Sequence, residues 1–183
     1  EWNIGDDSIG KRYGATVREW DLMNKLLKGL ESDPFGRRHI MNLYQESDLK
    51  ETEGLHPCAY ETIWSVRKIK DGIYLDMTLI QRSNDYLMAG YINKIQYTAL
   101  MMMVASHLGY KVGKFCHMTQ NLHIYDRHID AAKEIFGKSV VLGINPRIEL
   151  NVQKNFYDIT LEDFEIFEID GISKINSPLE IAI

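Results

Sequence analysis

One of the chain's two cysteines, Cys58, stands in the stretch GLHPCAYET, directly after a proline. A cysteine acts as a nucleophile when its thiolate is favoured, usually by a nearby cation. The only basic neighbour is His56, whose side chain can point elsewhere along a strand or turn. An isolated cysteine is often a small buried side chain, so local sequence leaves both readings of Cys58 open. We interpret Cys116, inside an apolar strand-like run, as a core residue.

A second group of polar residues, QRSND, ends another strand-like run. Arg82, Ser83 and Asp85 stand where that strand would leave the sheet, and Arg and Ser side chains are good phosphate ligands. An ordinary strand end closed by an Asx turn explains the same letters. Arg37 and Arg38 form an adjacent pair at a turn, from which both can reach one anion. A solvated pair of charges is the usual explanation.

The stretch NLHIYDRH carries His123, Tyr125 and His128. His123 and Tyr125 are two residues apart, so on a strand they share a face. The two histidines are five residues apart, which is not the spacing of a helical zinc pair, and no HExxH or CxxC is present. We therefore expect no metal site. GKRYG lacks the spacing of a Gly-rich phosphate loop.

The composition predicts one globular domain over residues 1–183, since 45% of residues are hydrophobic and 26% are charged. A net charge of −5 argues against non-specific binding to DNA or anionic membranes. No apolar run reaches the roughly 18 residues of a membrane helix. Two cysteines are no disulfide framework, which favours a reducing, cytoplasmic location. The chain lacks a starting methionine, as expected for a processed or partial version of a longer protein.

Apolar spacing predicts a helix over residues 16–33 and a second, apolar all round and therefore buried, over 93–110 with Gly109 as its cap. An amphipathic helix is predicted over 126–137, ending at Gly137. Strands are predicted over residues 37–44, 60–69, 73–83, 111–118, 147–152 and 163–169. The letters KDG join the second and third strands as a hairpin. The mixture is α+β, with strands placed too irregularly for a doubly wound sheet.

In this order the segments resemble the thymidylate synthase family, the folate-dependent type with a cysteine nucleophile. The likeness runs from EWNIGDDSIGKRYG to SPLEIAI through Tyr-Gly, Arg-Arg, Pro-Cys, Gln-Arg-Ser-x-Asp, an asparagine eight residues later, His-x-Tyr and the C-terminal Ala-Ile. Each motif is weak alone, but together they are in register over nearly the whole chain. The resemblance implies a three-layer α/β sandwich with a large mixed, twisted sheet and a buried central helix. It also implies a homodimer of sheets stacked back to back.

The resemblance further implies reductive methylation of dUMP to dTMP, with 5,10-methylene-tetrahydrofolate or an atypical methylene-pterin as one-carbon and hydride donor. Cys58 would be the nucleophile that adds to C6 of the pyrimidine. Tyr13 would help to remove the C5 proton. Asn93 would read the uracil edge and stabilise the developing oxyanion. Asp85 would hold the pterin ring.

The same resemblance implies the remaining substrate contacts. The phosphate would bind Arg82 and Ser83, with Arg82 also close enough to favour the thiolate. A neighbouring subunit would add a pair of arginines, and two further residues would contact the ribose hydroxyls. The full set of expected substrate-binding residues is Arg37, Arg38, Gln81, Arg82, Ser83, Asn93, His123 and Tyr125.

Some positions depart from the usual family pattern. Ala59 stands where many members have histidine, which marks a branch with a small residue there. Gln120 and Asn121 add bulk on the folate side, and the family's N-terminal segment is absent from this sequence. The chain is compatible with the short archaeal-type branch. A pyrimidine-nucleotide 5-hydroxymethylase and a nucleotide- or RNA-binding homologue without turnover stay open as alternatives, although Asn93 favours a uracil nucleotide over a cytosine nucleotide.

Overall fold

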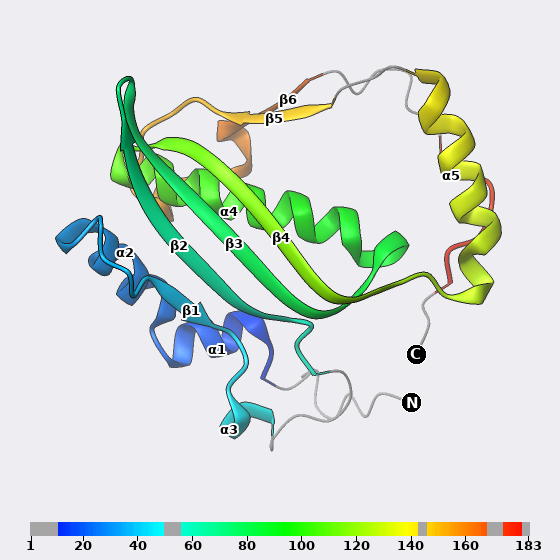
Figure 1. Ribbon diagram of the computed structural model, residues 1–183, viewed down its shortest axis with the longest axis horizontal. Helices are drawn as coiled ribbons and strands as arrows, with labels where there is room; N and C mark the ends of the chain where they lie inside the picture. Colours follow the sequence, from blue (N-terminus) through cyan, green and yellow to red (C-terminus); the bar gives the residue numbers. More distant parts are fainter. Residues whose placement is uncertain (1–10, 50–55, 143–145, 168–173, 181–183) are drawn as a thin grey trace.

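The computed structural model describes residues 11–49, 56–142, 146–167 and 174–180. Four strands form a mixed sheet in the order β1–β2–β3–β4 (Figure 1). Their bounds are β1 (Ile40–Asn42), β2 (Ala59–Ile69), β3 (Gly72–Asp85) and β4 (Lys111–His123). The first three are antiparallel neighbours, and β4 runs parallel to β3. A separate antiparallel pair consists of β5 (Arg147–Leu150) and β6 (Phe164–Phe167).

The helices are α1 (Tyr13–Glu19), α2 (Leu22–Ser32), α3 (Glu46–Leu49), α4 (Tyr91–Leu108) and α5 (Ile129–Leu142). Short helical turns lie at η2 (Tyr86–Gly90), η3 (Asp126–His128), η4 (Phe156–Asp158) and η5 (Leu161–Asp163). The α+β class is confirmed, and each predicted strand has an observed counterpart with shifted ends. In the part of the chain that the structure describes, no helix has the length and apolar character needed to cross a membrane.

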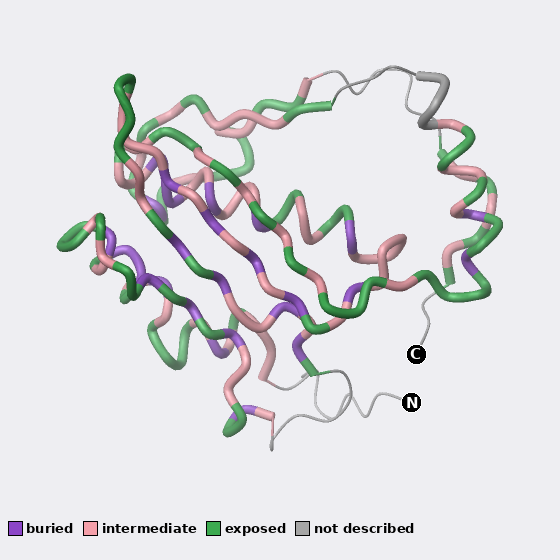
Figure 2. Tube along the Cα trace, viewed as in Figure 1, coloured by how far each residue is buried: buried purple, intermediate pink, exposed green. Residues whose placement is uncertain are grey.

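The core lies between one face of the sheet and the helices α1, α2 and α4 (Figure 2). Side chains alternate along β3, so every second residue faces this core. The buried set includes Leu26, Leu27 and Leu30 of α2, Trp64 of β2, Leu75, Met77 and Leu79 of β3, and Met101 and Val104 of α4. This packing fixes the sheet register, because a shift by one residue would turn the apolar set toward solvent.

The predicted helix over residues 16–33 is wrong as a single element, because the chain breaks between α1 and α2. Asp21 has a φ of 52°, a left-handed conformation that Asp tolerates better than most side chains. Buried Asp48 holds the end of α1, since it accepts hydrogen bonds from the Thr16 hydroxyl at 2.6 Å and the Trp20 indole at 3.4 Å. The bond from Thr16 is the main reason why the pKa of Asp48 is lowered. These bonds set the place of Tyr13 at the start of α1.

Helix α4 is the crossover between the parallel strands β3 and β4. It ends as predicted at Gly109, whose φ of 68° is left-handed and suits glycine. One face of α4 is buried against the sheet, whereas Ile92 and Ile95 near its N-terminus are exposed. The predicted end of the next helix at Gly137 is wrong, because α5 continues to Leu142. A Cβ at Gly137 would meet no atom within 4 Å, so this glycine marks no close contact.

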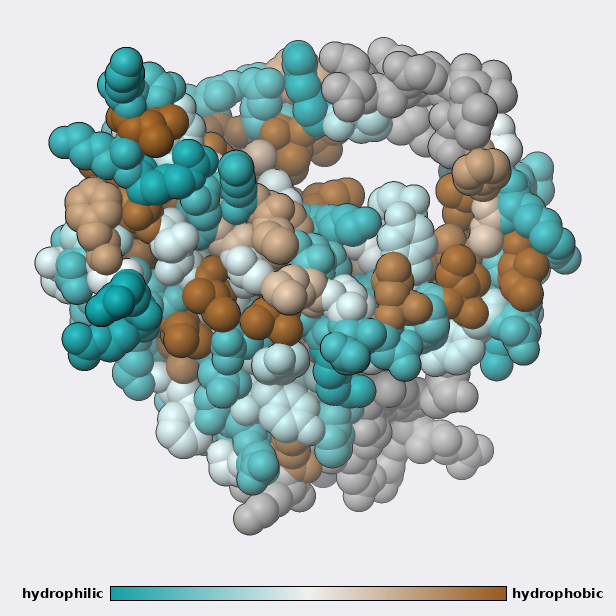
Figure 3. Space-filling view, in the orientation of Figure 1, coloured by the Kyte–Doolittle hydropathy of each residue, from teal (hydrophilic) through white to brown (hydrophobic). Residues whose placement is uncertain are grey.

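The other face of the sheet is uncovered by helices in the described residues, and on it apolar and polar side chains are intermixed (Figure 3). Ile40, Ile63, Thr78 and Cys116 form a row across the four strands of this face. Cys116 is exposed, so its interpretation as a core residue is wrong. The alternation along β4 explains this, because its neighbours Phe115 and His117 are the side chains directed toward the core.

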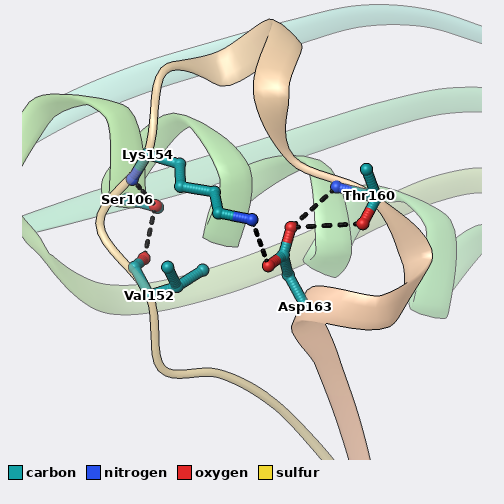
Figure 4. Close-up of polar contacts among 5 residues, drawn as sticks. All are labelled: Ser106, Val152, Lys154, Thr160 and Asp163. Carbon is teal, nitrogen blue, oxygen red and sulfur yellow. Dashed lines mark hydrogen bonds and ion pairs between the residues drawn. The ribbon is translucent and has the colours of Figure 1, made fainter.

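The segment after β5 is fastened to the C-terminal end of α4 (Figure 4). The Ser106 hydroxyl donates to the carbonyl of Val152 at 2.6 Å and accepts from the Lys154 N–H at 3.2 Å. Asp163 accepts from the Lys154 ammonium group and from the Thr160 N–H. These contacts support α4 at the end opposite to Asn93.

Candidate active site

Most of the expected site residues gather at one end of the sheet. The start of β2 and the end of β3 lie at the same end of the sheet because the two strands are antiparallel, with Ala59 opposite Gln81. The end of β4 joins them because it runs parallel to β3, with Asp85 opposite His123. The pairing therefore brings the Cys58 segment, the QRSND segment and the His-x-Tyr segment together.

The thiol of Cys58 lies next to the guanidinium of Arg82. The Arg82 Nη2 is 4.0 Å from the Cys58 Sγ, at the outer limit for a hydrogen bond to sulfur. Arg82 is held in place because its side chain donates to the carbonyls of Pro57 at 3.0 Å and His56 at 2.9 Å. A fixed cation at this distance attracts a thiolate. The cation that local sequence did not supply therefore comes from β3.

Tyr13 lies against the backbone of the cysteine segment. Its phenolic oxygen accepts hydrogen bonds from the N–H groups of Cys58 at 2.8 Å and Ala59 at 3.3 Å. Burial raises the pKa of the Tyr13 phenol, and these two bonds offset only part of that effect. The phenol therefore stays protonated at neutral pH. Its own O–H remains able to donate to a molecule beside Cys58.

Asn93 belongs to a chain of amide groups, of which Gln81 and Asn84 are buried and Asn93 is partly buried. Its Oδ1 accepts from the Gln81 Nε2 at 3.0 Å and from the Asn84 Nδ2 at 3.1 Å. The Gln81 Oε1 in turn accepts from Asn84 at 2.7 Å and lies 2.6 Å from the His117 Nε2. Burial lowers the pKa of His117, with a further contribution from Lys94, so its imidazole is neutral at neutral pH. The Nε2 then carries the hydrogen that it donates to Gln81.

This chain fixes which end of the Asn93 side chain is available. Its Oδ1 is occupied by two donors, whereas its NH₂ group has no partner in the described residues. Asn93 therefore offers a hydrogen-bond donor to a ligand. Gln81 is 1% exposed and engaged with protein groups, so its placement favours orienting Asn93 over a direct contact with substrate.

His123, Tyr125 and Asp85 lie at the end of the sheet beyond the cysteine. The rings of His123 and Tyr125 pack edge to face, with centroids 5.0 Å apart. The Asp85 Oδ1 accepts from the N–H groups of Leu87 and Met88, both at 3.2 Å, and so caps η2. Its Oδ2 has no hydrogen-bond partner in the described residues. A carboxylate oxygen there fits N–H donors of a ring such as a pterin.

Arg82 is the expected phosphate contact that lines a cavity at this end of the sheet. A cavity of about 290 Å³ is lined by Asn42, Tyr44, Tyr60, Glu61 and Arg82. Ser83 lies next to Arg82, opposite Asn121 of β4. The structure does not bring Arg37 and Arg38 to Cys58 within this chain. Both are exposed just before β1, whose first residue Ile40 pairs with Ile63 in the middle of β2.

Sequence reasoning missed Asn84 and His117 as parts of the site. Asn84 was only the variable letter of Gln-Arg-Ser-x-Asp, and His117 was only a neighbour of Cys116. The sequence feature that could have indicated them is the presence of uncharged polar residues at positions that face the core. Gln81 and His117 share that face in the neighbouring strands β3 and β4. The C-terminal Ala-Ile lies outside the described residues. Among those that are described, no three His, Cys, Asp or Glu side chains are arranged to hold a metal ion.

Comparison with known proteins gives one consistent family. A family model described as thymidylate synthase matches residues 1–181. A thymidylate synthase of Lactococcus lactis subsp. cremoris (strain SK11) is 52% identical over 175 residues, and one of Streptococcus pneumoniae (strain ATCC 700669 / Spain 23F-1) is 48% identical. Each alignment covers 94% of this chain, which spans 62% of those relatives' length. The solved thermostable thymidylate synthase A from Bacillus subtilis has a TM-score of 0.80 at 28% identity, covering 100% of this chain and 66% of its own.

Proposed function

The chain belongs to the thymidylate synthase family, and we propose that it catalyses the reductive methylation of dUMP to dTMP. The co-substrate would be 5,10-methylene-tetrahydrofolate or a related methylene-pterin, which supplies the one-carbon unit and the hydride. The observation that carries the proposal is the contact of Cys58 with a fixed Arg82, beside a protonated Tyr13. Gln81, the residue before Arg82, in turn holds Asn93, whose NH₂ group has no partner in the described residues.

These residues suit the addition of a nucleophile to uracil. The Cys58 thiolate would form a bond to C6 and leave negative charge on the carbonyl at C4. The Asn93 NH₂ group would donate to that oxygen, where a preorganised donor stabilises developing charge. The phenol of Tyr13 would help to remove the proton from C5. The phosphate would lie near Arg82 and Ser83, and the ribose near His123 and Tyr125.

The methylene-pterin would bind on the side of Asp85. The support is its Oδ2, which is free of hydrogen bonds in the described residues, next to the rings of His123 and Tyr125. Gln120 and Asn121 flank this side on β4. The one oxygen of Asp85 that η2 does not use can accept an N–H bond from the edge of an aminopyrimidinone ring.

The test is incubation of the protein with 5-tritiated dUMP and methylene-tetrahydrofolate, followed by product mass and tritium release. We expect a methyl product and one tritium released for each product formed. A hydroxymethyl product would identify a pyrimidine-nucleotide 5-hydroxymethylase instead. Tight dUMP binding without tritium release would identify a binding homologue without turnover. Either result would overturn the proposal.

We also propose that the protein is a homodimer formed through the uncovered face of the sheet. Ile40, Ile63 and Met118 are exposed on this face, and Arg37 and Arg38 would reach the phosphate of the neighbouring subunit. Sedimentation should give a dimer, and Arg37→Ala with Arg38→Ala should weaken dUMP binding about tenfold or more. A monomer that binds dUMP tightly would contradict both statements.

A cytoplasmic location is part of the same proposal, because the reaction requires a free thiol. Both Cys58 and Cys116 are free, and reduced thiols are the rule in the cytosol. Fractionation of cells that make the protein would test the location. Recovery in an oxidising compartment would contradict it.

A further inference from the structure

His128 is completely buried where η3 meets α5, yet one of its ring nitrogens has no hydrogen bond among the residues that the structure describes. Its Nε2 lies 2.7 Å from the carbonyl oxygen of Glu180. Its Nδ1 has no hydrogen-bond partner in the described part of the chain and lies 4.0 Å from the Asp85 Oδ2. Buried polar atoms are nearly always hydrogen-bonded, and leaving one without a partner is costly. A simple packing role would be better served by an apolar side chain.

The ring of His128 contacts both halves of the candidate site. The Tyr125 ring packs edge to face against it, with centroids 6.0 Å apart, and Tyr125 belongs to the expected nucleotide side. Asp85 belongs to the expected pterin side. The carbonyl of Glu180 belongs to the C-terminal segment. One buried side chain therefore lies against its near neighbour Tyr125 and against two segments that are distant in sequence, at Asp85 and at Glu180.

The C-terminal segment reaches His128 along a defined path on α5. The Lys138 ammonium donates to the carbonyl of Lys174, and Glu134 accepts from the N–H groups of Asn176 and Ser177 at 2.9 Å. The bond from Lys138 and those N–H bonds lower the pKa of Glu134 to about 2. Glu134 therefore stays ionised and holds this segment, and the bond from His128 is the next contact along it.

The hydrogen positions follow from the partners. A carbonyl only accepts, so the Nε2 of His128 carries a hydrogen. The Nδ1 is then a bare lone pair or, after binding a second proton, a donor directed at Asp85. Asp85 suits the second state because its Oδ1 is used by η2 whereas its Oδ2 faces the ring. A shortening of the 4.0 Å separation would complete a charge-assisted hydrogen bond.

We propose that His128 is a positioning residue that links the Asp85 carboxylate to the C-terminal segment at Glu180. The inference rests on the proposed function, in which Asp85 holds the pterin ring. His128 retains the segment through its Nε2–H and orients the Asp85 Oδ2 through its Nδ1.

Two matched variants separate the two contacts. The amide nitrogen of glutamine can replace the Nε2, so His128→Gln keeps the bond to Glu180 and loses the group facing Asp85. Asparagine can replace the Nδ1, so His128→Asn does the reverse. We expect His128→Gln to keep wild-type hydrogen exchange at residues 174–180 while KM for methylene-tetrahydrofolate rises about tenfold and dUMP affinity is unchanged. We expect His128→Asn to speed that exchange about tenfold.

An unchanged pterin KM in His128→Gln, or unchanged exchange in His128→Asn, would overturn the proposal. Loss of dUMP binding in both variants would assign His128 to general packing and would also overturn it. If wild type shows no turnover, the proposed function fails, and ¹⁵N NMR of the His128 ring still tests the link. Asp85→Asn should shift the Nδ1 resonance, and no shift would refute the contact.

Discussion

Replacement of Cys58 by alanine is expected to lower turnover by about 10³-fold or more, because without the thiol the covalent intermediate with C6 cannot form. The structure gives the physical reason. Hydrogen bonds to two carbonyls hold the Arg82 guanidinium 4.0 Å from the Cys58 sulfur. The cation can therefore stabilise a thiolate at position 58. Intact mass after incubation with 5-fluoro-dUMP and methylene-tetrahydrofolate measures the covalent step directly, since fluorine at C5 cannot leave as a proton.

The matched control is Cys116→Ala, which removes the chain's other free thiol. Cys116 is exposed on the uncovered face of the sheet and lies away from the Cys58 edge. Wild type and Cys116→Ala should form the adduct, whereas Cys58→Ala should not. An adduct of equal yield in Cys58→Ala would refute the nucleophile assignment. Loss of the adduct in Cys116→Ala alone would refute it as well.

Much of the fold could be predicted because its strands carry a periodic signal. Val, Ile, Leu and Met alternate along β2 and β3, and KDG marks their turn, so the hairpin follows from local chemistry. The break between α1 and α2 could not be predicted in this way. It depends on Asp48, distant in sequence, which accepts bonds from Thr16 and Trp20. Apolar spacing continues through the break and gives no sign of it.

In the candidate site, too, some features could be predicted from the sequence and others depend on distant contacts. Cys58 and Arg82 could be paired only by family resemblance, because their contact depends on the antiparallel pairing of β2 with β3. Asn93 could be named from the same resemblance, by its place eight residues after Asp85, but the direction of its amide could not be predicted. That direction depends on Gln81, which is itself oriented by His117 from β4. Hydrogen-bond direction is a property of the whole network, so single motifs do not contain it.

The direction of the Asn93 amide has a consequence for base recognition. Its Oδ1 accepts two protein donors, and in the described part of the chain its NH₂ group has no partner, so it could donate to a ligand. At the position that this group would reach, uracil presents the O4 acceptor and cytosine presents the N4 amino donor. A donor on the protein therefore matches uracil and opposes cytosine. Aspartate has the same shape, and its Oδ1 can keep both bonds from Gln81 and Asn84.

Asn93→Asp is accordingly expected to lower kcat/KM for dUMP by about 10²-fold or more and to make dCMP the better substrate, since a site built for one hydrogen-bond pattern rejects its complement. Product mass after competition between dUMP and dCMP measures the preference. Asn155→Asp is the matched control, because Asn155 only caps η4 through an oxygen that aspartate also has. That variant should keep the preference for dUMP. If Asn93→Asp still prefers dUMP as strongly as wild type does, the free NH₂ group of Asn93 is not what reads the base.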